Sequence, residues 1–256
     1  MVLPNIDILN GLTGLEIILS GYILAFILIF KHARRAPNNK VRRKIILRGV
    51  GIFSVFQAWF GVSASFVLML LGFPPLSGPI EVISPDALNI GVLGYAWGPA
   101  LGIPIWTYVA IDTYKESSYK KRVQIFMTGF MAIISLIFAI LIYADSAKYT
   151  KYDVSLIGGL PETGIKGTAM ALLALLLIIM MVLLGPTIIY SGLKMDDKSA
   201  KWKRYSLGIG LTLASFAGIL DAAFGADDFG LIGLAIVKAV IFTSIFLIYE
   251  GVDKGS

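Results

Sequence analysis

The sequence predicts an all-α polytopic membrane protein, a bundle of seven transmembrane helices. Of its 256 residues, 57% are hydrophobic and only 15% are charged, a balance that water-soluble domains of this size do not have. The apolar residues are gathered in seven runs of about 20 residues, the length that crosses a bilayer as a helix. Such long runs are unlike the short alternating strands of a membrane β-barrel.

The seven predicted spans are bounded by charged or turn-rich loops. The first run is too long for a signal-peptide core and lacks a basic start, so we expect it to be retained. Together the spans form a single domain, 1–256. They cover residues about 9–30, 46–72, 88–113, 123–144, 168–192, 205–225 and 230–250.

The basic residues predict the orientation. Most Lys and Arg residues lie in the loops after the first, third and fifth spans, whereas the opposite loops carry only Lys148, Lys151 and Lys166. Because basic loops stay cytoplasmic, we expect the N-terminus outside and the C-terminus in the cytoplasm of a cell-membrane protein. The net charge of +6 lies in these short loops, so it indicates contact with anionic lipid and no nucleic-acid partner.

The first two spans carry polar side chains at depth. Glu16 lies in the outer half of the first span, and the second span contains Gln57 and, near mid-depth, Trp59. Polar groups inside a bilayer need partners, which makes all three candidates for a ligand site. The Pro-rich and Gly-rich stretch 73–89 is expected to form an ordered outer cap without regular structure.

The third span combines glycines with two prolines. Pro99 and Pro104 each lack a backbone donor, so we expect a kinked helix. The glycines favour close helix packing, and the same features also suit the wall of a cavity. Trp97 on this span is a further candidate ligand contact.

The fourth and fifth spans offer few polar side chains. The fifth is uniformly apolar up to Gly185-Pro186, where a kink is expected. The loop 145–167 between them is the longest outside segment. Its tyrosines and glycines suit a lid or an interfacial belt.

The last two spans bring opposite charges into the hydrophobic zone. Lys238 lies about 13 Å into the seventh span, near the midplane of a hydrocarbon core about 30 Å thick. Side chains lean toward the N-terminus of their own helix, so Lys238 and Asp221 of the antiparallel sixth span lean together, and we predict an ion pair. Glu16 joins them if the first span closes a ring against the seventh. Alternatively, Glu16 and Asp221 only anchor their helices at the outer interface.

The sequence lacks the residues of common enzymes. With no cysteine and one histidine, His32, it excludes disulfides, thiol chemistry and most zinc sites. It contains no HExxH motif, and Asp112 and Asp221 lie near opposite faces, too far apart for an aspartyl dyad. Asp112 is expected to be solvated. We therefore expect no catalytic or metal-binding residues and no enzymatic activity.

Seven spans, an outside N-terminus and Lys238 in the last span resemble the outline of microbial rhodopsins. The resemblance implies retinal on Lys238 as a Schiff base, with Asp221 as counter-ion, in a light-driven pump, channel or photosensor. The chain departs from that family at Leu234, where a carboxylate is usual, and in the third span, where Gly and Pro replace an acid. The fifth and sixth spans also contain no Trp. Retinal is therefore the alternative, and our first interpretation has no cofactor.

Other motifs resemble the seven-helix sensor regions that precede histidine kinases, and their free-standing archaeal relatives. Pro104-Ile105-Trp106 followed by Tyr108 is similar to the end of their third span, and the loop 145–167 is similar to their long outer loop. Lys238 followed by Tyr249-Glu250-Gly251 is similar to their last span. The chain ends soon after Glu250, so the resemblance implies output to a separate partner through the basic loops.

These observations lead to one expected function and two alternatives. We expect a receptor-like sensor that binds a small or lipophilic ligand in its outer half and signals to a cytoplasmic partner. The alternatives are the divergent rhodopsin and a small transporter or channel, although no internal repeat supports a transporter. The ligand, the partner and the oligomeric state are left open. The expected ligand-binding residues are Lys238, Asp221, Glu16, Trp97, Gln57 and Trp59.

Overall fold

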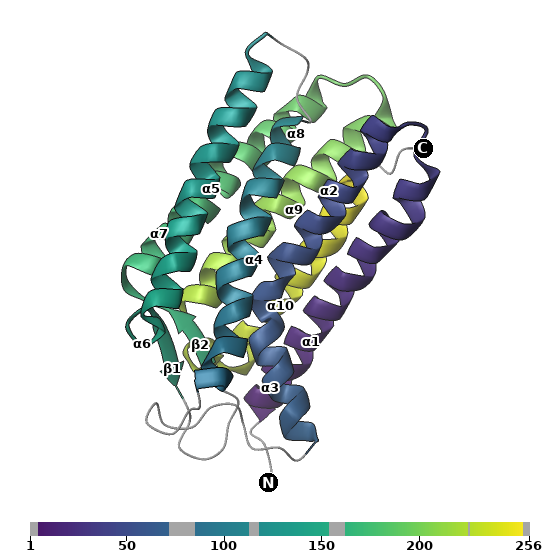
Figure 1. The fold of residues 1–256 in the computed structure, drawn as a ribbon. Helices are drawn as coiled ribbons and strands as arrows, with labels where there is room; N and C mark the ends of the chain where they lie inside the picture. The colour runs from purple at the N-terminus through teal and green to yellow at the C-terminus, as the bar shows by residue number, and fades with distance from the viewer. Residues whose placement is uncertain (1–4, 72–84, 113–117, 154–161, 225, 253–256) are drawn as a thin grey trace.

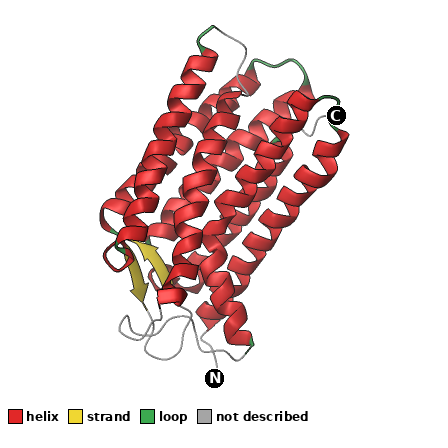
Figure 2. Cartoon of the chain, in the orientation of Figure 1, coloured by secondary structure: helices red, strands yellow, loops and turns green. Residues whose placement is uncertain are grey.

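The computed structural model describes residues 5–71, 85–112, 118–153, 162–224 and 226–252 of the chain. Long helices fill these ranges and lie side by side in one bundle (Figures 1 and 2). The predicted helical fold is confirmed, and within the described ranges five helical segments are long and apolar enough to cross a membrane. These segments are Ile8–Arg35, Lys120–Ala144, Gly167–Leu193, Lys198–Ala223 and Gly230–Gly251.

The described helices follow the order of the predicted spans. α1 (Asn5–Phe26) continues through the π-helix η1 (Ile27–His32) into the short 3₁₀ helix η2 (Ala33–Arg35). The second rod comprises α2 (Asn39–Phe56), the 3₁₀ turn η3 (Gln57–Trp59) and α3 (Phe60–Leu70). The others are α4 (Pro85–Asp112), α5 (Lys120–Ala144), the series α7 (Gly167–Ile178), η4 (Ile179–Leu184) and α8 (Gly185–Leu193), then α9 (Lys198–Ala223) and α10 (Ala226–Gly251).

Two helices begin well before the apolar residues that predicted them. α2 starts at Asn39, where the Asn38 side chain accepts a hydrogen bond from the backbone N–H of Val41, and α9 starts at Lys198 after the N-cap Asp197. These caps satisfy backbone donors that a helix start would leave unpaired, so the helix continues through the basic residues. The basic loops of the prediction are therefore partly helical.

The helical fold is interrupted by strands in one described segment. Within the loop 145–167, a short helix α6 (Ser146–Tyr149) precedes the strands β1 (Thr150–Asp153) and β2 (Glu162–Ile165). The strands pair antiparallel with Thr150 opposite Ile165, and the Ile165 side chain is buried. Four-residue strands carry too short an alternation to be read from the sequence. The predicted cap at 73–89 lies mostly outside the described residues.

The rods form a closed ring. Along the ring, α1 packs against α2, α2 against α4, α4 against α5, α5 against α7, and α9 against both α7 and α10. α1 also packs against α10, so the first and last helices meet and close the ring. The interior is filled by large apolar side chains that are almost fully buried, among them Leu28, Ile52, Phe56, Phe138 and Leu176.

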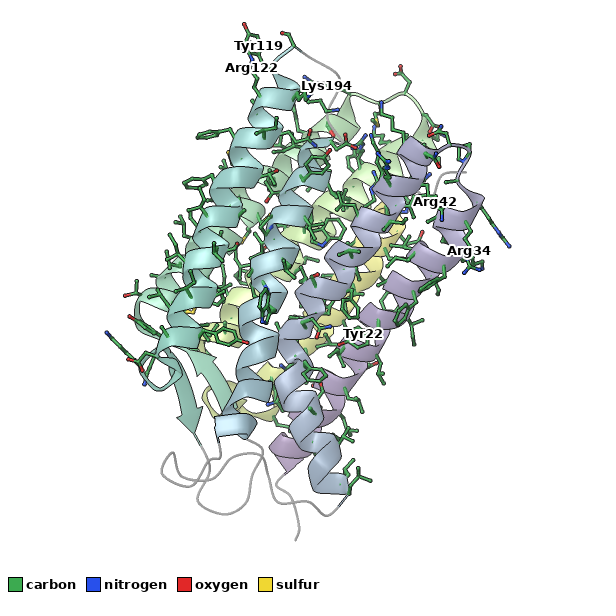
Figure 3. All side chains as sticks on the ribbon, in the orientation of Figure 1. Tyr22, Arg34, Arg42, Tyr119, Arg122 and Lys194 are labelled. Carbon is green, nitrogen blue, oxygen red and sulfur yellow. The ribbon has the colours of Figure 1, made fainter. Side chains whose placement is uncertain are left out.

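Basic residues of the three predicted cytoplasmic loops gather at one end of this ring. In Figure 3, Arg34, Arg42, Arg122 and Lys194 all lie toward the end where α9 and α2 begin and α10 stops. We call this end, defined by these four residues, the basic end. The short strands β1 and β2 lie at the opposite end (Figure 2).

Candidate functional site

The predicted ion pair between the last two helices is present. The Lys238 Nζ atom lies 2.7 Å from Oδ1 of Asp221, and the two side chains are only 5% and 16% exposed. α9 and α10 run antiparallel with only a short connection between Ala223 and Ala226, which brings the two residues to the same level. The prediction that Lys238 is partnered by Asp221 is confirmed.

The second carboxylate oxygen of Asp221 is held from across the ring. The indole Nε1 of Trp59 donates a hydrogen bond of 2.8 Å to Oδ2 of Asp221. The Lys238 ammonium also lies 6.0 Å from the centroid of the Trp59 ring, at the outer limit of a cation–π contact. Charge-assisted hydrogen bonds of this length are strong, and each buried charge has a partner. We call Asp221, Lys238 and Trp59 the central triad.

Trp59 reaches the triad because η3 packs very closely against α4. Gly94, Gly98 and Gly102 of α4 recur every fourth residue, the first two against this turn and Gly102 against Val55 at the end of α2. A Cβ atom at Gly98 would lie 2.8 Å from the carbonyl oxygen of Ser54, and one at Gly94 would collide with that of Gln57. Small residues at this spacing allow helix backbones to touch, as expected for this span. α4 itself continues as one helix through Pro99 and Pro104.

The turn η3 is itself held by hydrogen bonds and stacking. The Ser63 hydroxyl donates to the backbone carbonyl of Trp59 at 2.8 Å, and the Phe56 and Trp59 rings stack with centroids 5.8 Å apart. A short 3₁₀ stretch in the middle of a helical rod often marks a hinge or a functional position. Here it rotates the Trp59 side chain toward α9.

A cavity of about 80 Å³ adjoins the triad inside the ring. Its walls come from α2, η3, α4, α7 and α9, that is, from helices on several sides of the ring. Among the lining residues that the structure describes, Asp221 carries the one charge and the others are largely apolar. They are Val55, Ala58, Trp59, Pro99, Ile103, Leu173, Leu177, Ala214, Gly218, Asp221 and Ala222. Such a site suits a small apolar group with one polar atom near Asp221.

Three of the six expected site residues lie elsewhere. The Gln57 Nε2 atom lies 2.6 Å from the Tyr22 hydroxyl between α1 and the second rod, the region where Figure 3 labels Tyr22. The Trp97 side chain is half exposed, and its indole donates to the Tyr143 hydroxyl of α5 at 3.2 Å. Glu16 is exposed on α1. Although the ring closes, none of these three side chains lines the cavity as described.

Most of the residues that line the cavity were not predicted from the sequence. The fifth span was described only as uniformly apolar up to Gly185-Pro186, but Leu173 and Leu177 line the cavity from α7. Also overlooked were the small residues of α9, where Ala214 and Gly218 precede Asp221 at intervals that place them on one face. Small side chains next to an intramembrane charge were the available signal. Within the described residues, no group of three His, Cys, Asp or Glu side chains could hold a metal ion.

Comparison of the chain with protein-family models, curated proteins and solved structures finds no match.

Proposed function

We propose that the chain is a receptor-like membrane sensor that binds a small lipophilic ligand in the cavity beside Asp221 and Trp59. The observation that supports this proposal is that two residues of the central triad, Asp221 and Trp59, also line the cavity. Asp221 forms the buried ion pair with Lys238 and accepts the hydrogen bond from Trp59. A purely structural ion pair needs no adjoining space, whereas a ligand site needs apolar walls and a few polar groups for orientation. Ionisable groups inside membranes are functional candidates for the same reason.

The proposal includes all seven rods as membrane spans, with the basic end in the cytoplasm. This places the N-terminus outside the cell membrane and the C-terminus inside. The five segments that are long and apolar enough to cross a membrane pack in the same ring as α2–α3 and α4, which supports the larger number. The triad and its cavity then lie toward the outer half, and the basic end faces a separate cytoplasmic signalling partner.

A coupling mechanism follows from the position of Trp59. A ligand with a hydroxyl or amine group competes with the indole N–H for Oδ2 of Asp221. Releasing the indole removes one of the contacts that hold η3, which is the junction between the two helices α2 and α3. α2 leads from there to the basic end. A ligand that binds better when the Trp59–Asp221 hydrogen bond is broken therefore favours conformations in which α2 is displaced at the basic end.

The cavity is tested by filling it. In a thermal-shift screen of small lipophilic alcohols and amines, the wild-type protein should be stabilised by a subset of compounds. Gly218→Val fills the cavity wall, since a Cβ there meets only the Leu177 side chain at 3.6 Å, and should abolish that stabilisation. Gly129→Val is the matched control on α5, where a Cβ meets nothing within 4 Å. Equal responses of both variants would reject the cavity as the site.

The orientation is tested by cysteine labelling, since the chain has no native cysteine. Lys148→Cys, at the end with the strands, should react with a membrane-impermeant maleimide in intact cells. Ser199→Cys, at the basic end, should react only after permeabilisation. The reverse pattern would overturn the proposed topology and leave the cavity proposal to the ligand screen.

A divergent rhodopsin is the second candidate, and the specific observation that favours it is the carboxylate 2.7 Å from the Lys238 ammonium. That arrangement would suit a Schiff base and its counter-ion. We nevertheless expect no visible absorption band when all-trans retinal is added to the purified protein. The cavity of about 80 Å³ is far smaller than typical ligand pockets of roughly 300–1,000 Å³. A coloured pigment that is lost in Lys238→Ala would favour the rhodopsin interpretation.

A further inference from the structure

A second and larger cavity, of about 320 Å³, opens at the basic end of the ring. α2 and α9 supply most of its walls, α4 contributes its last residue, Asp112, and α10 contributes Gly251. The lining residues are Val41, Lys44, Arg48, Asp112, Met195, Asp197, Ser199, Ala200, Lys203, Arg204 and Gly251. The Asp112 side chain, expected to be solvated, is 17% exposed and lies 2.7 Å from the Lys44 ammonium.

The cavity carries an excess of positive charge. Four cationic side chains line it, Lys44 and Arg48 from α2 and Lys203 and Arg204 from α9, against the two carboxylates of Asp112 and Asp197. Both carboxylates are engaged: Asp112 pairs with Lys44, and Asp197 accepts the backbone N–H groups of Ser199 and Ala200 as the N-cap of α9. Arg48, Lys203 and Arg204 have interactions of their own, which a ligand would share or replace.

The position of these cations follows from helix spacing. Val41, Lys44 and Arg48 are three and four residues apart and therefore share one face of α2. On α9, Ser199, Ala200, Lys203 and Arg204 share a face in the same way. Arg204 packs closely against the preceding helix α8. A Cβ atom added at Gly192 of α8 would lie only 2.9 Å from the Cβ atom of Arg204. Two basic faces therefore converge across the ring mouth.

We propose that this cavity binds a phosphate-bearing ligand, independently of the cavity beside the central triad. The excess of two positive charges matches a phosphate group of one or two negative charges. The guanidinium groups of Arg48 and Arg204 present planar donor forks that suit phosphate oxygens, and lysines add point charges. The volume admits a ligand larger than a single phosphate group. Its place at the mouth of the ring favours a ligand from the aqueous phase over a lipid headgroup.

Calorimetric titration of the purified protein with inorganic pyrophosphate tests the proposal. We expect saturable binding, and a dissociation constant raised about tenfold or more in the double variant Arg48→Gln/Arg204→Gln. The control is Arg42→Gln/Arg122→Gln, which removes the same charge from two exposed positions at the same end and should leave the dissociation constant within about twofold. If the first double variant fails to fold, Lys203→Gln replaces it, with an expected loss of severalfold.

A lipid arm separates the two sources of phosphate. Native mass spectrometry counts phosphatidic acid molecules bound to the same variants in otherwise neutral detergent. Pyrophosphate binding that depends on Arg48 and Arg204 identifies an aqueous ligand. If only the binding of phosphatidic acid depends on these two arginines, the ligand is a lipid headgroup. Either result supports a phosphate site. No saturable binding of either probe, or an equal loss in both double variants, overturns the proposal.

Discussion

The molecule contains two Lys–Asp ion pairs of identical length in different surroundings. Lys238 and Asp221 approach to 2.7 Å within the ring, and Lys44 and Asp112 approach to 2.7 Å at the basic end. The first lysine side chain is 5% exposed and the second is 38% exposed. Distance alone therefore says little about the energy of an ion pair. What separates the two is the cost of leaving one partner without the other.

The largest effect is expected from removing one charge of the central triad. Asp221→Asn leaves the Lys238 ammonium buried without a counter-charge and should destabilise the protein by about 3–5 kcal/mol. Lys238→Met should cost less, because Asp221 is more exposed than Lys238 and keeps the Trp59 hydrogen bond. Thermal midpoints in detergent measure both effects.

The double variant Asp221→Asn/Lys238→Met controls for this interpretation. Once both charges are gone, no ion is stranded, so the double variant should be more stable than Asp221→Asn alone. Equal thermal midpoints for the two single variants would count against the ion pair as the main partner of Lys238.

A smaller effect is expected from Trp59→Phe, which keeps an aromatic ring but removes the N–H donor. Loss of a hydrogen bond to a charged group should destabilise the protein by about 1.5–3 kcal/mol. Trp97→Phe is the matched control, since that indole is half exposed and donates to a tyrosine hydroxyl at 3.2 Å. A Trp59→Phe midpoint no lower than that of the control would show that Oδ2 of Asp221 finds another donor.

The smallest effect is expected at the basic end. Lys44→Met should change stability by at most about 1 kcal/mol, because the ammonium is partly exposed and its attraction to Asp112 is screened. Added salt should reduce even this difference, whereas it should leave the effect of Asp221→Asn nearly unchanged. A Lys44→Met effect as large and as salt-insensitive as that of Asp221→Asn would remove the distinction between the two pairs.

The part of the site that could be predicted from sequence is the part set by helix direction. Asp221 and Lys238 lie on consecutive helices of opposite direction, so their depths and the lean of their side chains follow from their numbers alone. Trp59 was singled out because it lies near mid-depth of the predicted second span. Its hydrogen-bond acceptor, Asp221, could not be predicted, because η3 and α9 are far apart in the sequence and are brought together only by the tertiary packing of the ring.

Glu16 and Trp97, which were expected in the site but do not line the cavity, show that the sequence does not reveal which face of each helix is buried. Glu16 is exposed on α1, while the adjacent Ile17 and Ile18 are buried. A step of one residue turns a helix by about 100°, and in an apolar span both faces look alike because lipid is as apolar as the core. The rotation of α1 and of α4 about their own axes, which decides whether Glu16 and Trp97 are exposed, is therefore set by packing.

The cavity at the basic end was beyond prediction for another reason. Its residues belong to helical extensions of α2 and α9 that the hydrophobic runs do not delimit, and they converge only when the ring is complete. The strands β1 and β2 were missed because each has only four residues. The described helices were predicted within a few residues at most boundaries, since length and apolarity define them directly.

The short connection between α9 and α10 also affects how the protein is made. Asp221 and Lys238 are synthesised last, after α1 to α8 have emerged. Each charge alone would oppose transfer of its helix into lipid, but α9 and α10 can enter as a hairpin in which the two charges neutralise each other. Trp59, much earlier in the chain, is synthesised before either of them. Lengthening the connection should therefore lower the yield of inserted protein more than its final stability.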